Sequence, residues 1–432
     1  MIVRSLDAFE ILDSRGIPTL QAQLMLENGV QIAASVPSGK STGKHEACEL
    51  RDGDQGRHGG KGVLRAVEAV RALGTKLEGQ ALPPQRELDR WLIEQDGTPN
   101  KTRLGANALL GVSIAAARAR AMAEGIPLYE ALDTAERPTL PVPSFNVLNG
   151  GAHADNALDF QEFMIMPAGL PNFREALRAG AEVYHALAHL LESKHLSVSV
   201  GDEGGFAPQI RRPEEALDLL MEATERAGYR PGEDVFFSLD PAANGFFHPT
   251  LYGGGGYQFD DRKLDPEGMV ALYEGWLGRY PILSIEDGLA EEDTRGWRAL
   301  SQRLRDRVQL VGDDIFVSNP TRVKAAIADG IGNAVLLKPN QIGTVSEILE
   351  TARVARQGGF RQMVSHRSGE TTDDFIADLA VALACGQIKS GAPARGERVA
   401  KYNRLLWIER RLGPRAVYAG RETFAVAGAG HP

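Results

Sequence analysis

The sequence predicts an α/β fold: a (β/α) barrel preceded by a smaller α+β domain. The main observation is that six apolar runs in the second half of the 432-residue chain each end in a charged or imidazole side chain. These terminal residues are separated by 46, 27, 25, 28 and 23 residues, roughly the length of one strand, one loop and one helix. The second observation is that strands come before helices, rather than alternating with them, in the first part of the chain.

Residues 1–135 are predicted to form the α+β domain. The segments TLQAQLML and VQIAASV predict a β-hairpin that turns at Asn28 and Gly29. Helical patterns follow at about residues 60–75, 84–95 and 104–124. The last of them is rich in alanine and is expected to be buried. Three prolines in RPTLPVP, residues 137–143, predict a linker, so the barrel is expected to span residues 136–432.

The barrel is predicted to begin irregularly. Two strands, SFNVL and FQEFMIMP, flank the loop NGGAHADN and precede two helical patterns near residues 173–195 and 213–228. Regular alternation of strand and helix starts only near residue 235, so the expected order is ββαα(βα)6. The glycine run in LYGGGGYQF, residues 251–259, predicts a flexible loop.

The six apolar runs indicate where the chemistry takes place. They end at Asp240, Glu286, Asp313, Lys338, His366 and Lys389. Parallel barrel strands place their carboxyl ends on one face, so these side chains are expected to converge there. Converging carboxylates repel one another unless a cation lies between them, and oxygen-only ligands indicate Mg²⁺ or a similar hard cation. A helix N-cap or a surface charge would explain any one of these residues, but not six in register.

Composition and charge exclude several classes of protein. The net charge of −9, without a basic cluster, argues against nucleic acid as the main partner. Cys48 and Cys385 are too few for a disulfide framework, the N-terminus has no signal-peptide pattern, and no apolar run is as long as a membrane span. We therefore expect a cytoplasmic enzyme without membrane attachment.

Longer strings resemble the enolase family along nearly the whole chain. VGDEGGFAP and VSHRSGET are the most specific, and EILDSRG, VPSGKSTGKHEACELRDGD, FNVLNGGAHADN, QEFMIMP, SIEDGLAEED, QLVGDDIFVSNP and LLKPNQIGT also match. The resemblance implies an enolase-type ββαα(βα)6 barrel preceded by a small α+β N-terminal domain. It also implies a lyase that dehydrates 2-phosphoglycerate to phosphoenolpyruvate in glycolysis, with two Mg²⁺ ions per active site.

By this resemblance, the metal ligands are three carboxylates and one serine. Asp240, Glu286 and Asp313 correspond to the ligands of the tighter Mg²⁺. Ser41, in the Gly- and Ser-rich loop 36–45, corresponds to a ligand of a second ion that arrives with the substrate phosphate. Closure of this loop is expected to exclude water. Metal ions suit the reaction because removing the proton α to a carboxylate leaves two negative charges on that carboxylate.

The resemblance also implies the acid and base groups. Lys338 corresponds to the general base, and an amine acts as a base near neutral pH only if its ammonium form is disfavoured, as nearby Mg²⁺ and Lys389 would do. Glu203 corresponds to the acid that helps the C3 hydroxyl leave as water. Glu162 corresponds to its partner carboxylate, with which it can share one proton. His153 is placed with these catalytic residues.

The remaining site residues are expected to bind substrate. Lys389 corresponds to the group that binds the substrate carboxylate. Arg367 and Ser368 correspond to the phosphate binders, a role that suits a planar guanidinium. His366 and Gln161 complete the substrate-binding set.

Two departures from the usual enolase pattern lie near the site. Lys40 stands beside Ser41 where a small residue is usual. Its ammonium either meets an additional anionic group of the substrate or points to solvent. Asn244 and Gly245 stand where most enolases carry Ser-Glu.

A third departure concerns assembly. Family dimers usually carry two ion pairs across the interface, and the corresponding positions here hold Phe9 with Arg410 and Gln21 with Trp407. Replacing both members of each pair avoids stranding a charge at the interface. We therefore expect a homodimer, or a higher oligomer of dimers, with an interface rebuilt on aromatic contacts.

Two alternatives to a glycolytic enolase stay open at this point. One is an enolase paralogue of secondary metabolism that acts on a related phosphorylated or phosphonate three-carbon acid, similar to carboxyphosphonoenolpyruvate synthase. The other is a non-catalytic binding or scaffold protein.

Overall fold

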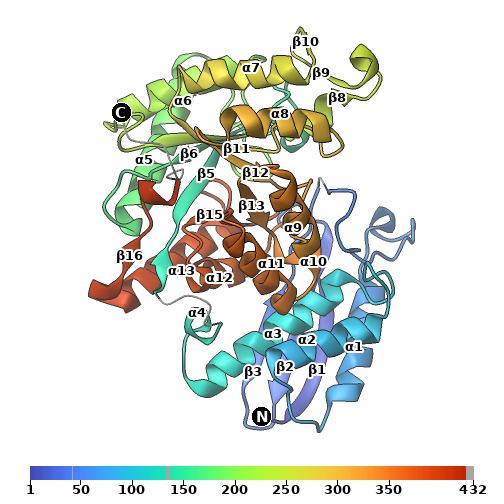
Figure 1. The fold of residues 1–432 in the computed structure, drawn as a ribbon. Helices are drawn as coiled ribbons and strands as arrows, with labels where there is room; N and C mark the ends of the chain where they lie inside the picture. The colour runs from blue at the N-terminus through green and yellow to red at the C-terminus, as the bar shows by residue number, and fades with distance from the viewer. Residues whose placement is uncertain (41, 133–136, 425–432) are drawn as a thin grey trace.

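The computed structural model describes residues 1–40, 42–132 and 137–424 and consists of an N-terminal α+β unit beside a barrel (Figure 1). The N-terminal strands are β1 (Val3–Leu12), β2 (Pro18–Leu26) and β3 (Gln31–Ser35), paired antiparallel in the order β1-β2-β3. The helices that follow are α1 (Leu64–Leu77), α2 (Gln85–Asp96), α3 (Ala106–Glu124) and α4 (Leu128–Ala131). The predicted order of strands then helices is confirmed, and the sheet has one strand more than the predicted hairpin.

Two local features explain how this unit forms. Gly29 has φ of +88° at the hairpin turn, a backbone conformation that glycine adopts without a steric penalty. The alanine-rich α3 is buried around most of its circumference, as predicted, because its small side chains let β2 and β3 approach it closely.

The barrel is closed by eight strands, β5, β6, β7 and β11 to β15 (Figure 1). They are β5 (Val142–Asn149), β6 (Glu162–Met166), β7 (Phe236–Asp240), β11 (Ile282–Glu286), β12 (Gln309–Gly312), β13 (Ala334–Leu337), β14 (Arg361–Ser365) and β15 (Gln387–Lys389). β6 runs antiparallel to both of its neighbours, whereas the other neighbouring pairs are parallel. The predicted ββαα(βα)6 order is confirmed.

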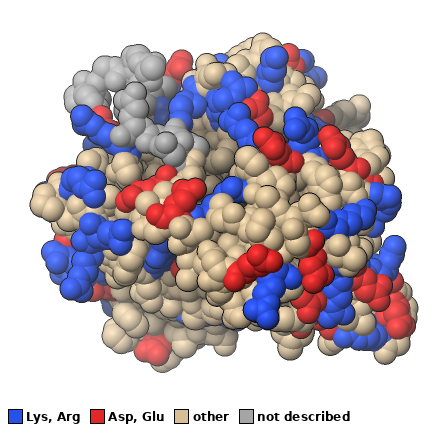
Figure 2. Space-filling view, turned by 90° about the horizontal axis from the view of Figure 1, so that it is seen from below, with Lys and Arg blue, Asp and Glu red and all other residues tan. Residues whose placement is uncertain are grey.

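The barrel helices lie outside the strands. They are α5 (Phe173–Ser193), α6 (Pro213–Arg226), α7 (Pro266–Leu277), α8 (Thr294–Leu304), α9 (Pro320–Asp329), α10 (Pro339–Ile342), α11 (Val345–Gln357), α12 (Phe375–Leu383) and α13 (Gly396–Leu412). The short 3₁₀ turns are His58–Gly60, Gly151–His153, Ala243–Phe246, Leu251–Gly253, Gly413–Arg415 and Arg421–Phe424. No helix within the described residues has the length and apolar character needed to cross a membrane. Figure 2 shows one face of the molecule, on which Lys and Arg side chains are interspersed with Asp and Glu side chains.

Two local predictions were wrong. Residues 251–259 are not simply a flexible loop, because β9 (Gly256–Phe259) pairs with β8 (Phe247–His248) and β10 (Arg262–Leu264). Tyr257 and Phe259 are buried, and the Tyr257 hydroxyl donates to Asp293 Oδ2 over 2.7 Å, which anchors the strand. The expected linker at 137–143 also contains strand: β4 (Thr139–Leu140), paired with β16 (Val417–Tyr418), and the start of β5.

The predicted convergence at the barrel face is confirmed. Asp240, Glu286 and Lys389 are the last residues of β7, β11 and β15. Asp313, Lys338 and His366 directly follow β12, β13 and β14.

A buried carboxylate joins the N-terminal unit to the barrel. Asp373, just before α12, accepts hydrogen bonds from Arg118 of α3 at 2.6 and 2.9 Å and from the backbone N–H of Ser35 at 3.0 Å. Burial raises the pKa of Asp373, but Arg118 outweighs this effect and holds that pKa below its ordinary value. This contact therefore fixes the edge of the N-terminal sheet beside the barrel face.

We predict that Asp373→Asn lowers the free energy of unfolding by about 3 kcal/mol, because it removes the more buried of the two carboxylates that pair with Arg118. Since the pKa of Asp373 is lowered by folding, its contribution is present above the unfolded pKa of about 4 and is lost as pH falls through the folded value. Urea unfolding at pH 7 and pH 3 measures both effects, and the difference between wild type and variant should shrink at the lower pH.

Asp374→Asn is the matched control. Asp374 also contacts Arg118, at 2.9 Å, but its side chain is 41% exposed. Asp374→Asn should therefore lower the free energy of unfolding by less than Asp373→Asn does. Equal losses of stability in the two variants would contradict the assignment of Asp373 as the main partner of Arg118.

Candidate active site

Three buried carboxylates lie at the ends of adjacent strands. Asp240 and Glu286 end β7 and β11, Asp313 directly follows β12, and these strands are neighbours in the barrel. All three side chains are buried. Burial raises the pKa of Glu286 well above its ordinary value, and the charge of Asp240 raises it further. The repulsion and the all-oxygen donor set fit a hard divalent cation.

Two lysines neutralise these carboxylates in the structure. Lys389 Nζ lies 3.0 Å from Asp240 Oδ2, 2.9 Å from Glu286 Oε1 and 3.0 Å from Glu162 Oε2. Lys338 Nζ donates to Asp313 Oδ2, and Gln341 Nε2 donates to the other Asp313 oxygen over 2.8 Å. The lysines therefore lie directly beside the three expected metal ligands.

Neighbouring carboxylates keep Lys338 basic. Burial lowers the pKa of Lys338, but Asp313 and Glu286 together outweigh burial and hold that pKa above its ordinary value. Lys389 lowers it, the direction expected from the sequence, by less than Asp313 raises it. A cation that engaged the Asp313 carboxylate would weaken this effect and lower the pKa of Lys338.

A second acidic group lies near Lys389. One side-chain atom of each of His153, Glu162 and Glu203 lies within 4.8 Å of the others, and all three residues are buried. Burial and the charge of Glu203 raise the pKa of Glu162 well above its ordinary value. Burial also raises the pKa of Glu203, but His366 and His153 outweigh it and hold that pKa well below its ordinary value. When the pair shares one proton, Glu162 carries it.

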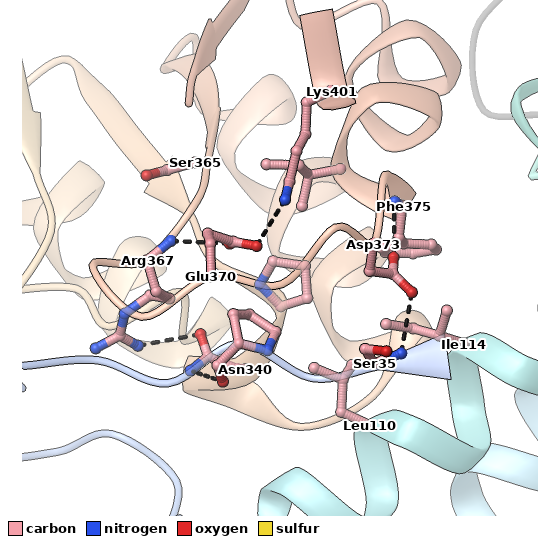
Figure 3. A pocket seen from close by; sticks show the side chains of 13 residues that line it. Ser35, Leu110, Ile114, Asn340, Ser365, Arg367, Glu370, Asp373, Phe375 and Lys401 are labelled. Atoms are coloured by element: carbon pink, nitrogen blue, oxygen red, sulfur yellow. Dashed lines mark hydrogen bonds and ion pairs between the residues drawn. The ribbon is translucent and has the colours of Figure 1, made fainter. Parts of the chain in front are cut away.

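The loop that follows β14 is held from both sides. The Arg367 guanidinium contacts Glu46 at 2.9 and 3.1 Å and donates to Asn340 Oδ1 over 3.0 Å. The Arg367 backbone N–H donates to Glu370, whose other oxygen accepts from Lys401 Nζ over 2.7 Å (Figure 3). These contacts fix the direction of the Arg367 side chain.

The N-terminal loop meets the same segment. Ser38 and Gly369 exchange two backbone hydrogen bonds of 2.8 and 2.9 Å. The backbone N–H of Lys40 donates to Ser368 Oγ over 2.8 Å. Residues 38–40 therefore lie against the expected phosphate-binding residues, whereas Ser41 lies outside the described residues.

Comparison with known proteins identifies the family. The enolase N-terminal domain profile matches residues 3–132, and the enolase C-terminal TIM barrel domain profile matches residues 137–427. A curated protein named "Enolase" from Rubrobacter xylanophilus is 56% identical over 418 residues, which cover 96% of each chain. The chain belongs to the enolase family. The resemblance inferred from the sequence is confirmed.

The described residues of the expected enolase site lie at one face of the barrel. Gln161 lines a cavity at this face together with Thr42, Asn244 and Asp314. Asn244 joins two neighbouring loops, because its Nδ2 donates to Asp314 Oδ2 over 2.9 Å and its Oδ1 accepts from the Glu291 backbone over 2.8 Å. This bridge gives a structural reason for one residue that departs from the usual enolase pattern.

The sequence did not single out several residues that touch the site. Glu46 and Gln341 lie within strings that match the family, so their motif context was an available signal. The same holds for Asn146, which donates to Glu203 Oε2 over 3.0 Å and lies in FNVLNGGAHADN. Arg398, described below, had no such signal.

Lys40 neither points freely to solvent nor lacks a partner. Its Nζ lies 3.0 Å from Asp202 Oδ2, and the two side chains are 45% and 27% exposed. Asp202 precedes Glu203, so this ion pair links the N-terminal loop to the loop of the carboxylate pair.

We predict that Lys40→Ala changes KM and kcat for 2-phosphoglycerate by less than about fivefold, because an exposed ion pair contributes at most about 1 kcal/mol. Lys44→Ala is the control. Lys44 lies on the same loop as Lys40 and makes an exposed ion pair of 2.8 Å with Glu292. Steady-state kinetics on 2-phosphoglycerate and phosphonate analogues provides the test. A change in substrate preference of more than tenfold, in Lys40→Ala alone, would mean that Lys40 contacts the substrate.

Proposed function

We propose that this protein is a cytoplasmic phosphopyruvate hydratase that dehydrates 2-phosphoglycerate to phosphoenolpyruvate in glycolysis. The observation that carries the proposal is the arrangement of three buried carboxylates with Lys338 beside one of them and the Glu162–Glu203 pair near Lys389. The enolase relative, which matches over nearly the full length, supports the same activity.

The proposed cofactor is Mg²⁺, two ions per active site. Asp240, Glu286 and Asp313 would hold one ion, and Ser41 with the substrate phosphate would hold the second. When bound, the ions supply positive charge where the substrate carboxylate becomes doubly negative. The mutual repulsion of the three carboxylates supports this assignment.

The protein's own groups then handle substrate and protons. Lys338 takes the C2 proton, and the Glu162–Glu203 pair gives a proton to the C3 hydroxyl, which leaves as water. Lys389 binds the substrate carboxylate, while Arg367 and Ser368 bind the phosphate. His153 supports the carboxylate pair, and Gln161 and His366 border the substrate.

The two alternatives are less well supported. Lys40 is paired with Asp202, which weakens the argument for an extra anionic group on a specialised substrate. A scaffold protein has no need for two lysines buried among four carboxylates, an arrangement that suits acid–base chemistry. An absorbance assay for phosphoenolpyruvate formation from 2-phosphoglycerate tests the proposed activity directly.

We predict that chelation abolishes this activity and that added Mg²⁺ restores it. Asp313→Asn should weaken Mg²⁺ binding at least tenfold, because an amide oxygen replaces a charged ligand. Titration calorimetry of the full chain measures the binding, with Asp306→Asn as a charge-matched control on the loop between α8 and β12. Full turnover in chelator would rule out the metal-dependent mechanism.

We further predict that the base and acid variants separate two steps. Lys338→Ala should stop exchange of the C2 proton with solvent. Glu203→Gln should slow water loss by about a hundredfold or more yet leave measurable C2 exchange, because the base remains. Deuterium incorporation followed by NMR distinguishes them, and equal loss of exchange in both variants would contradict the separate roles.

We also propose a homodimer, or an oligomer of dimers, that pairs through the N-terminal unit and α13. Trp407 on α13 is 44% exposed, with the guanidinia of Arg404 and Arg411 at 4.2 and 5.4 Å from its ring centroid. Phe9 is partly exposed and lies opposite Gln21 in the β1–β2 pair. These positions offer aromatic contacts in place of ion pairs.

The expected dimer tolerates high salt, because apolar contacts are barely screened. Trp407→Arg should weaken it by adding a third cation beside Arg404 and Arg411. Sedimentation velocity across a salt series measures both effects. Ready dissociation of the wild-type dimer as salt rises would show that ion pairs hold the interface.

A further inference from the structure

One fully buried arginine touches both loops that carry the acid–base and phosphate-binding residues. Arg398 on α13 is 0% exposed. Its Nη2 donates to the carbonyls of Asp202 over 3.0 Å and Ser368 over 2.7 Å, and its Nη1 donates to the carbonyl of Arg367 over 2.6 Å. The guanidinium thereby ties the Glu203 loop to the segment that follows β14.

The same guanidinium also contacts a side chain of the site. Arg398 Nη1 lies 2.7 Å from His366 Nδ1. An arginine is always protonated and can only donate, so His366 Nδ1 must accept and cannot carry a proton. The single proton of the neutral ring then lies on Nε2, which is 3.2 Å from Glu203 Oε2.

We infer that Arg398 is a positioning residue that fixes His366 as the Nε2–H tautomer and aims its proton at Glu203. This role deepens the proposed function, and it rests on that function only for its catalytic consequence. The surroundings of the His366 ring are consistent with a neutral imidazole. Burial lowers the pKa of His366 to about 3, although Glu203 opposes this effect in part.

The two carboxylate oxygens of Glu203 therefore have different contacts and different roles. Oε2 accepts from Asn146 Nδ2 over 3.0 Å and lies 3.2 Å from His366 Nε2. Oε1 faces His153, whose Nδ1 is 3.7 Å distant. Because Oε2 already accepts from Asn146 and faces His366 Nε2, Oε1 is the oxygen that exchanges a proton with Glu162 or with the departing hydroxyl.

The chain offers a matched control one helical turn away. Lys401 is also on α13, is 1% exposed, and also holds the segment after β14, through Glu370 at 2.7 Å and the Thr371 carbonyl at 2.6 Å. The third group to which its ammonium donates is the Glu397 carbonyl, 2.7 Å away, rather than His366. Replacing either cation should loosen the segment, but only replacing Arg398 releases the His366 tautomer.

The direct test is ¹⁵N NMR of the full-length protein labelled at histidine, with the His366 signals assigned by their loss in His366→Gln. We expect a neutral ring with the proton on Nε2 from pH 6 to pH 8. A proton on Nδ1, or an imidazolium that titrates in this range, would overturn the inference. This result does not depend on which substrate the enzyme uses, so it can fail while the proposed activity stands.

Kinetics of the two variants distinguishes a positioning role of Arg398 from a merely structural one. Arg398→Met should lower kcat about a hundredfold and slow water loss more than C2-proton exchange, since it disturbs Glu203 and leaves Lys338 intact. Lys401→Met should mainly raise KM, through Arg367, with the Nε2–H tautomer and the ratio of exchange to water loss unchanged. Equal shifts of that ratio in both variants would reduce Arg398 to a structural residue. If Arg398→Met does not fold, the wild-type NMR measurement still decides the tautomer.

Discussion

The burial of three carboxylates at the ends of neighbouring strands is the constraint on which the rest of the site depends. Asp240, Glu286 and Asp313 cannot lie together in a low-dielectric environment as bare anions, because the desolvation and repulsion would exceed what the fold can sustain. The contacts of Lys389 and Lys338 with these carboxylates supply the compensation within the protein itself. The same lysines are the groups expected to meet the substrate, so we expect charge balance and catalysis to depend on the same side chains.

Charge compensation extends outward through elements remote in sequence. The N-terminal unit contributes Glu46 to Arg367 and the backbone of residues 38–40 to the segment after β14. Helix α13 contributes two buried cations, Arg398 and Lys401, to the same segment. The expected phosphate-binding residues are thus held between the N-terminal unit and the last barrel helix, a geometry that neither domain provides alone.

Much of this arrangement could be predicted because it follows from strand periodicity. Apolar runs that end in Asp240, Glu286 or Lys389 indicate buried strands and the end at which each strand stops. The parallel strands of the barrel then bring these three side chains together. The buried strand β9 was not predicted, because the glycines before Tyr257 are typical of a flexible loop. The role of Arg398 could not be predicted, because its hydrogen-bond partners lie 30 or more residues away in the sequence. This role depends on which nitrogen of His366 the guanidinium contacts. The pairing of Lys40 with Asp202, 162 residues apart, was inaccessible for the same reason.

We expect the three carboxylates to form a cation site from which the lysines are displaced. Anomalous diffraction from crystals grown with Mn²⁺ would locate the cation. We predict an anomalous peak within coordination distance of Asp240, Glu286 and Asp313, with Lys389 Nζ moved away from at least one of the first two. A peak elsewhere, or none at saturating Mn²⁺ with Lys389 still in contact with Asp240 and Glu286, would show that these carboxylates do not form a cation site.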